Sequence, residues 1–158
     1  MKTTGILILV LAGYLHPLNA GNPQDIVGKW ITPENKSIIQ IEYIEGKYTG
    51  KIFMINPEIY VNGSAQKDVL NMDPGLRSRS LEGLTILSGI TYDQSKKRWN
   101  IERIYEPERG KYYEGYILMD GRDELRLRGH VPGKKWFGRT EVWKRVEGNE
   151  FFKMTSYE

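Results

Sequence analysis

The chain has 158 residues, no cysteine, a formal net charge of +3, and 39% hydrophobic residues. This length predicts a single domain. The missing cysteines exclude a disulfide scaffold, a thiolate metal site and a cysteine nucleophile, and so weak a positive charge gives no indication of nucleic-acid binding.

Residues Met1–Ala20 are typical of a secretory signal peptide. Lys2 supplies the positive start, an apolar stretch runs from Gly5 to Leu15, and Asn19-Ala20 offers a small residue for cleavage. The apolar stretch is too short for a membrane span, which takes about 20 residues. We therefore expect an exported protein, periplasmic or secreted, with a folded domain over residues 21–146 and a C-terminal tail over residues 147–158.

The rest of the chain predicts eight short strands, each bounded by Gly, Pro, Asn or Asp. Within Ser37–Ile44, for example, Ile39 and Ile41 alternate with Gln40 and Glu42, as in a strand with one buried face. The expected strands are Asp25–Thr32, Ser37–Ile44, Tyr48–Ile55, Leu84–Thr91, Arg98–Tyr105, Lys111–Met119, Glu124–Val131 and Trp136–Val146. Short turns between sequential antiparallel strands favour an up-and-down barrel over a two-sheet sandwich.

Aromatic and charged side chains share faces of several predicted strands. Because an unpaired buried charge costs several kcal/mol, such faces indicate a wet internal cavity, the alternative being that they point outward. An eight-stranded barrel is just wide enough to hold one small ligand. The candidate wall residues are Tyr43, Phe53, Trp99, Tyr112, Tyr116 and Trp143, and the candidate partners of an anionic head group are Arg77, Arg79, Arg103 and Arg139.

The segment Asn56–Gly83 is long for a connection in a compact domain, and such segments are often lids or binding loops. Ser64 can cap a short helix over Ala65–Asn71, which Pro74 would end. Arg77 and Arg79 lie two residues apart and would point the same way in an extended chain, an arrangement suited to a carboxylate or phosphate. The alternative is a pair of structural salt bridges to Asp73, Glu82 or Glu106.

Several motifs resemble known families. Gly28-Lys29-Trp30 and Trp143-Lys144-Arg145 resemble the two ends of lipocalin-like barrels. The runs Asn71–Leu84, Ile104–Tyr113, Leu125–Gly129 and Gly138–Arg145 are similar to those of an uncharacterised family of small secreted bacterial proteins with a domain of unknown function. The resemblance implies an all-β, eight-stranded antiparallel barrel of lipocalin type in which Gly28, Trp30 and Arg145 close one end, and it brings no catalytic residues.

Three functions remain open. The first is a soluble binding protein for a small hydrophobic or amphipathic molecule, including an anionic one, without catalytic residues, metal or cofactor. The second is an envelope or secreted protein-interaction module. The tail carries Phe151 and Phe152, which either dock on the barrel of the same chain, the default expectation, or form an exposed apolar patch for a partner. The third is an enzyme that uses Glu106 and Glu108 at the barrel mouth, although both flank Pro107 in a predicted turn. His130 alternates with arginines on its strand, so we expect it at the surface.

Overall fold

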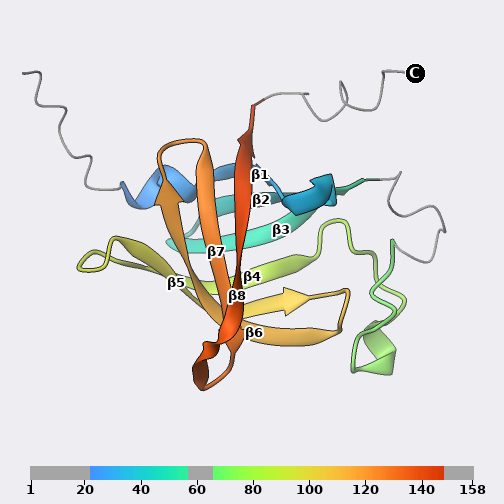
Figure 1. Ribbon diagram of the computed structural model, residues 1–158. Coiled ribbons are helices and arrows are strands. Elements are labelled where there is room, and N and C mark those ends of the chain that lie inside the picture. Colours follow the sequence, from blue (N-terminus) through green and yellow to red (C-terminus); the bar gives the residue numbers. More distant parts are fainter. Residues whose placement is uncertain (1–21, 57–65, 148–158) are drawn as a thin grey trace, which may run out of the picture.

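The computed structural model describes residues 22–56 and 66–147, which form one closed sheet in the order β1-β2-β3-β4-β5-β6-β7-β8 (Figure 1). Each strand pairs antiparallel with the next along the chain, and β8 returns to pair with β1. The predicted up-and-down barrel is therefore confirmed. Its strands are β1 (Gly28–Ile31), β2 (Ser37–Ile44), β3 (Lys47–Ile55), β4 (Thr85–Asp93), β5 (Arg98–Glu106), β6 (Lys111–Asp120), β7 (Glu124–Val131) and β8 (Lys134–Val146), with single 3-10 turns η1 (Pro23–Ile26), η2 (Pro33–Asn35) and η3 (Pro74–Leu76).

The first strand is shorter than predicted, because the residues before it form η1. The Asn22 side chain accepts a hydrogen bond from the backbone N–H of Gln24 (3.0 Å), and the Asp25 carboxylate accepts one from the N–H of Asn22 (2.8 Å). These bonds satisfy the free donors at the start of the turn. The chain turns into β1 only at Gly28, whose φ of 141° suits glycine.

The helix expected over Ala65–Asn71 is wrong for the described residues from Gln66 onward. The backbone there bonds across the segment instead: the N–H of Asp68 donates to the carbonyl of Arg79, and the N–H of Leu81 donates to the carbonyl of Gln66. In a helix, these backbone N–H and carbonyl groups would instead bond to residues four positions away along the chain. The one helical turn of this stretch is η3, which Asp73 caps through the N–H of Gly75.

One end of the barrel is closed by aromatic side chains beneath η1. The indole N–H of Trp30 donates to the carbonyl of Ile26 (2.9 Å), while the Trp99 indole and the Tyr48 hydroxyl both donate to the carbonyl of Pro23 (3.0 and 2.8 Å). Trp30 and Trp99 are fully buried. These bonds satisfy the polar atoms that their burial would otherwise leave unpaired.

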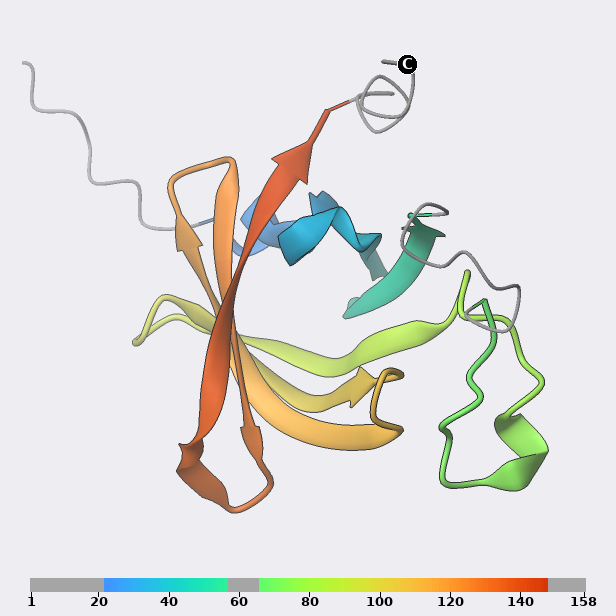
Figure 2. The same ribbon diagram turned by 45° about the vertical axis from the view of Figure 1, so that its right-hand side comes forward.

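The opposite end carries the turns that follow β1, β3, β5 and β7 (Figures 1 and 2). The pairing of β1 with β8 involves only Lys29–Ile31 and Lys144–Val146. Toward its start β8 pairs with β7 alone, and this hairpin extends away from β1 (Figure 2). A cavity opens at this end, between the hairpin and the other turns. Over the described residues, none of the helical segments has the length and apolar character that a membrane crossing needs.

Candidate functional site

A cavity of about 1580 Å³ occupies the open end of the barrel. Inward-facing residues of β2 to β8 form its walls, and the turns of the open end form its rim. Its volume exceeds the range of roughly 300–1,000 Å³ that holds a drug-sized ligand. The space is therefore large enough for a molecule with a long apolar chain.

The floor of the cavity is apolar. Its residues come from the inward faces of five strands, and they are Ile39, Leu87, Ile104, Leu127 and Trp143. All five are less than a tenth exposed, so they also form part of the barrel core. Such a surface suits the apolar part of a ligand.

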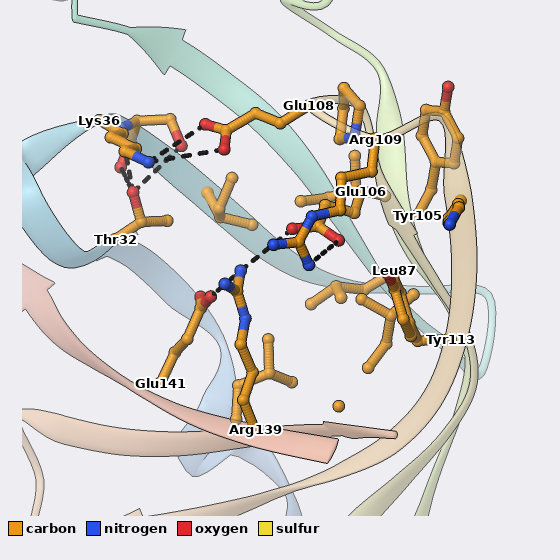
Figure 3. Close-up of a pocket in the computed structure, with 18 of the residues that line it drawn as sticks. Thr32, Lys36, Leu87, Tyr105, Glu106, Glu108, Arg109, Tyr113, Arg139 and Glu141 are labelled. Atoms are coloured by element: carbon orange, nitrogen blue, oxygen red, sulfur yellow. Dashed lines mark hydrogen bonds and ion pairs between the residues drawn. The ribbon is translucent and has the colours of Figure 1, made fainter. Parts of the chain in front are cut away.

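Charged side chains lie above this floor and bridge two strands (Figure 3). The Arg139 guanidinium on β8 is 3.1 Å from a carboxylate oxygen of Glu106 on β5 and 2.6 Å from one of Glu141. Glu106 also lies 3.5 Å from Arg109, and Glu141 accepts a hydrogen bond from the Trp143 indole (3.1 Å). The four charges sum to zero, which explains how carboxylates that are mostly buried are accommodated at an apolar cavity.

A second ion pair spans the mouth between other segments. Lys36, just before β2, lies 3.4 Å from Glu108 in the β5–β6 turn and 3.4 Å from Glu34 (Figure 3). Burial acts to lower the pKa of Lys36, but the two carboxylates outweigh it and raise the pKa above its usual value. Lys36 therefore stays charged and holds the two sides of the mouth together.

Of the ten residues predicted to bind a ligand, three line the cavity. They are Arg139 and Trp143, on the inward face of β8, and Tyr112 at the rim, whose ring also contacts Arg103 on the outer side of the barrel. On β8 the alternation of Arg139, Glu141 and Trp143 continues without interruption opposite Gly129, Leu127 and Leu125. The shared face predicted for these residues is therefore the inward one.

Two predicted residues lie at the closed end. Trp99 packs on Tyr92 with ring centroids 4.8 Å apart and is held by η1. Tyr43 packs against Tyr48 beside the β2–β3 turn, with ring centroids 4.4 Å apart, and is 45% exposed. Both lie on strands that line the cavity, but too far along them to reach it.

Three more of the predicted residues, Phe53, Tyr116 and Arg103, lie on the outer surface of the barrel. Lys29 lies over the Phe53 ring at 3.6 Å, Arg98 over Tyr116 at 4.4 Å, and Arg103 over Tyr112 at 5.0 Å. For Arg103 the cause is a register shift in β5 between Ile101 and Ile104. A bulge reverses the alternation, so Arg103 leaves the face that Trp99 and Ile101 share.

Arg77 and Arg79 hold the β3–β4 segment together through contacts within the segment. The Arg79 guanidinium lies 2.7 Å from the fully buried carboxylate of Asp68, and the Arg77 side chain donates to the carbonyl of Asn71 (2.8 Å). Asp68 also accepts a hydrogen bond from the Tyr105 hydroxyl (2.5 Å). Arg79 thus forms a structural salt bridge, but with Asp68 instead of one of the expected partners, whereas Arg77 bonds to a backbone carbonyl.

These contacts change the acidity of the Tyr105 hydroxyl. Burial, followed by the hydrogen bond to Asp68, raises the pKa of Tyr105 to about 12. Its hydroxyl also accepts a hydrogen bond from Asn71 (2.9 Å). The segment is therefore held by a neutral tyrosine, an amide and one buried ion pair, which we call the Asp68 cluster.

Sequence reasoning missed the Lys36–Glu108 bridge and the residues of the apolar floor other than Trp143. The alternation of Leu125, Leu127 and Gly129 on β7 carried the signal for part of the floor. His130, expected at the surface, is only 6% exposed. The backbone of β8 lies close to it, because a Cβ placed on Gly138 would come within 2.8 Å of the His130 Cβ.

The two carboxylates of the enzyme alternative each form an ion pair across the mouth, Glu106 with Arg139 and Glu108 with Lys36. They do not form a pair with one another in the described hydrogen-bond network. Within residues 22–56 and 66–147, no group of three or more His, Asp or Glu side chains is arranged to hold a metal ion.

The residues of this barrel match a family model over positions 28–145. The model describes uncharacterised proteins conserved in bacteria, DUF2147. The chain belongs to this family. The match begins at Gly28 and ends at Arg145, so the DUF2147 region spans the whole sheet except the last residue of β8. The comparison with curated proteins gave no match.

A solved structure is similar to this member of DUF2147. It is the protein HP1028 from the human pathogen Helicobacter pylori, described as belonging to the lipocalin family. The two share 25% sequence identity with a TM-score of 0.63, over 82% of this chain and 88% of the other. The barrel is therefore lipocalin-like, a fold that suggests binding of small molecules.

Proposed function

We propose that the barrel binds one small amphipathic molecule, with the apolar part on the floor of the cavity and the polar head at the mouth. The observation that carries this proposal is the cavity itself, in which Leu87, Leu127 and Trp143 lie below a ring of charged groups. Apolar walls with a few placed polar groups are the usual form of a small-molecule site.

The charge at the mouth favours a head group that both donates and accepts hydrogen bonds. Arg139 is the one candidate arginine at the cavity, and two carboxylates already flank it. A simple anion would meet Glu106 and Glu141 together with the guanidinium, so it would gain little net attraction. A neutral or zwitterionic head group can replace individual hydrogen bonds among the charged side chains at the mouth, and the site then carries no unbalanced charge.

The proposal includes export. Residues Met1–Ala20, which lie outside the described residues, have the composition of a signal peptide. A protein that acts in the periplasm or outside the cell can carry a poorly soluble molecule through water. The first experiment is therefore native mass spectrometry of the processed protein purified gently from its own host, followed by identification of any bound molecule.

A cavity-filling variant makes the test specific. Gly129 lines the cavity, and a Cβ added there would meet only the Cδ1 atom of Ile104, at 3.8 Å. Gly129→Leu should therefore fold and occupy ligand space. The matched control is Leu118→Phe, which adds volume at an exposed position of β6 outside the cavity lining.

The probes are a fatty acid, a fatty alcohol and an alkylamine of equal chain length, and their binding is followed by thermal shift and by tryptophan fluorescence in a Trp136→Phe background. We expect the fatty alcohol to bind best, Gly129→Leu to weaken binding at least about tenfold, and Leu118→Phe to leave it unchanged. A clean ligand-free mass together with no binding of any probe would contradict the proposal. So would equal affinities of Gly129→Leu and wild type.

A further inference from the structure

The tip of the β7–β8 hairpin exposes two aromatic side chains directly after two lysines. Trp136 is 79% exposed and Phe137 is 67% exposed. Lys134 and Lys135 precede them and are also exposed. The other three tryptophans of the chain are at most 3% exposed, so Trp136 stands apart in its exposure.

A second apolar group lies on the β3–β4 segment around η3. Met72 is 79% exposed and Leu76 is 38% exposed. Met72, Trp136 and Phe137 all line the rim of the cavity. Figures 1 and 2 differ by a turn about the vertical axis, and in both views the hairpin tip and η3 reach the lower edge of the described molecule. The two segments therefore lie on the same side of the molecule.

The charges around these apolar side chains are mainly positive. Within the described residues, neither Lys134 nor Lys135 forms an ion pair. Arg77, beside Leu76, donates to a backbone carbonyl only through its Nε. The acidic neighbour is Asp73, whose carboxylate caps η3. Exposed Trp and Phe with basic neighbours are typical of segments that lie in the interface of an anionic membrane.

We propose that this surface docks on an anionic lipid bilayer. The docking face comprises residues 134–137 with Met72, Leu76 and Arg77, and it inserts Trp136 and Phe137 at the level of the lipid head groups. An indole combines an apolar body with a polar N–H, which suits that depth. Anionic lipid neutralises Lys134 and Lys135, whereas a second copy on a two-fold axis would bring like charges together.

Docking would place the mouth of the cavity against the lipid, so that an amphipathic molecule could pass between bilayer and barrel with little exposure to water. This consequence rests on the proposed function, but docking itself does not. The Gly129→Leu variant separates the two, because it fills the cavity and leaves the docking face unchanged. Docking by that variant together with failed binding of every probe by the wild type would refute the proposed function alone.

Trp136 also provides the readout. Because Trp30, Trp99 and Trp143 are buried, a change of emission on adding vesicles reports mainly on Trp136. The protein is used as its host processes it, so that wild type and variants have the same N-terminus. We expect a blue shift, and quenching by brominated lipid, with vesicles of phosphatidylglycerol and phosphatidylcholine but not with phosphatidylcholine alone. Raising the salt concentration should weaken the binding.

Variants measured by vesicle co-sedimentation locate the contact. Trp136→Ser with Phe137→Ser, and separately Lys134→Glu with Lys135→Glu, should each weaken binding at least about tenfold. Ile44→Ser is the apolar control, because Ile44 is 55% exposed beside the β2–β3 turn at the closed end. Lys96→Glu with Lys97→Glu is the charge control, in the β4–β5 turn of the same end. Both controls should bind like wild type.

Three results would overturn the inference. The first is no binding to anionic vesicles at low salt. The second is equal binding by wild type and the Trp136→Ser, Phe137→Ser variant. The third is a dimer in sedimentation equilibrium without lipid that the same double variant converts to monomer, since the face would then belong to a second copy.

Discussion

The guanidinium of Arg145 lies 4.2 Å from the centre of the Trp30 indole, and the two residues face each other in the pairing of β1 with β8. Arg145 also donates hydrogen bonds to the carbonyls of Val27 (2.9 Å) and Asp25 (2.6 Å). The contact thus joins the first strand, the last strand and η1 at the closed end. A Cβ on Gly28 would come within 2.5 Å of this guanidinium, so the glycine leaves room for it.

Trp30→Ala should lower the free energy of unfolding by about 3–5 kcal/mol, because it empties a fully buried site and removes the surface on which Arg145 lies. Urea denaturation measures this loss. Trp136→Ala is the matched control, since the same truncation at an exposed position should cost less than about 1 kcal/mol. A loss below about 1 kcal/mol for Trp30→Ala would contradict the closure of this end by the indole.

Strand alternation and turn residues were enough to predict the barrel, because each strand pairs with its neighbour and needs only local signals. The inward face of β8 followed in the same way, from Arg139 to Trp143. On β5 the same reasoning failed at Arg103. The register shift after Ile101 reverses the alternation, and nothing in the residue pattern marks it.

The position of a residue along the barrel axis was a second feature that the sequence could not predict. Tyr43 and Trp99 were predicted to line the cavity, but the period of a strand says nothing about which end of the barrel a residue reaches. The Asp68 cluster was a third, since Asp68 and Tyr105 are 37 residues apart and only the folded chain brings them together. The sequence offered structural salt bridges for Arg77 and Arg79 as an alternative, without the buried partner.

Arg79→Ala should destabilise the protein by about 2–4 kcal/mol, because it leaves the buried carboxylate of Asp68 without its counter-ion. Arg77→Ala should cost less than about 1.5 kcal/mol, since it removes one hydrogen bond to a backbone carbonyl. Urea denaturation of both variants and hydrogen exchange of residues 66–84 test this difference. If the two losses were equal, or if Arg79→Ala weakened binding of an anionic probe without loss of stability, a structural role for Arg79 would be refuted.

Arg139→Ala should open the mouth and lower the free energy of unfolding by about 1–2 kcal/mol, because the arginine is largely exposed but its loss leaves the mostly buried Glu141 without its counter-ion. Acrylamide quenching of Trp143 reads out the opening in a Trp136→Phe background, where all remaining tryptophans are buried. We expect the quenching constant to rise at least about twofold over that background. Arg126→Ala, which breaks the ion pair with Asp120 at the closed end, is the control and should leave quenching unchanged. Equal quenching in both variants would show that Arg139 does not restrict access to the cavity.

Tyr105 should make the protein less stable in alkaline solution. Its pKa is raised to about 12 in the folded chain by burial and by the hydrogen bond to Asp68, against about 10 when unfolded. Between these values the unfolded chain has lost the proton and the folded chain still holds it. The free energy of unfolding therefore falls as the pH rises, by about 1.4 kcal/mol per unit, and the contribution is fully present below pH 10 or so.

The measurement is urea denaturation of wild type and Tyr105→Phe from neutral pH to about pH 12, compared as a difference because other groups titrate in the same range. Tyr105→Phe should be less stable at neutral pH by about 1–3 kcal/mol, since Asp68 loses a donor, and its stability should fall less steeply above pH 10 or so. Tyr112→Phe removes a hydroxyl from the ring stacked on Tyr105 and should keep the wild-type slope. If the free energy of unfolding fell with the same slope in wild type and Tyr105→Phe, the Asp68 cluster would not raise the pKa of Tyr105.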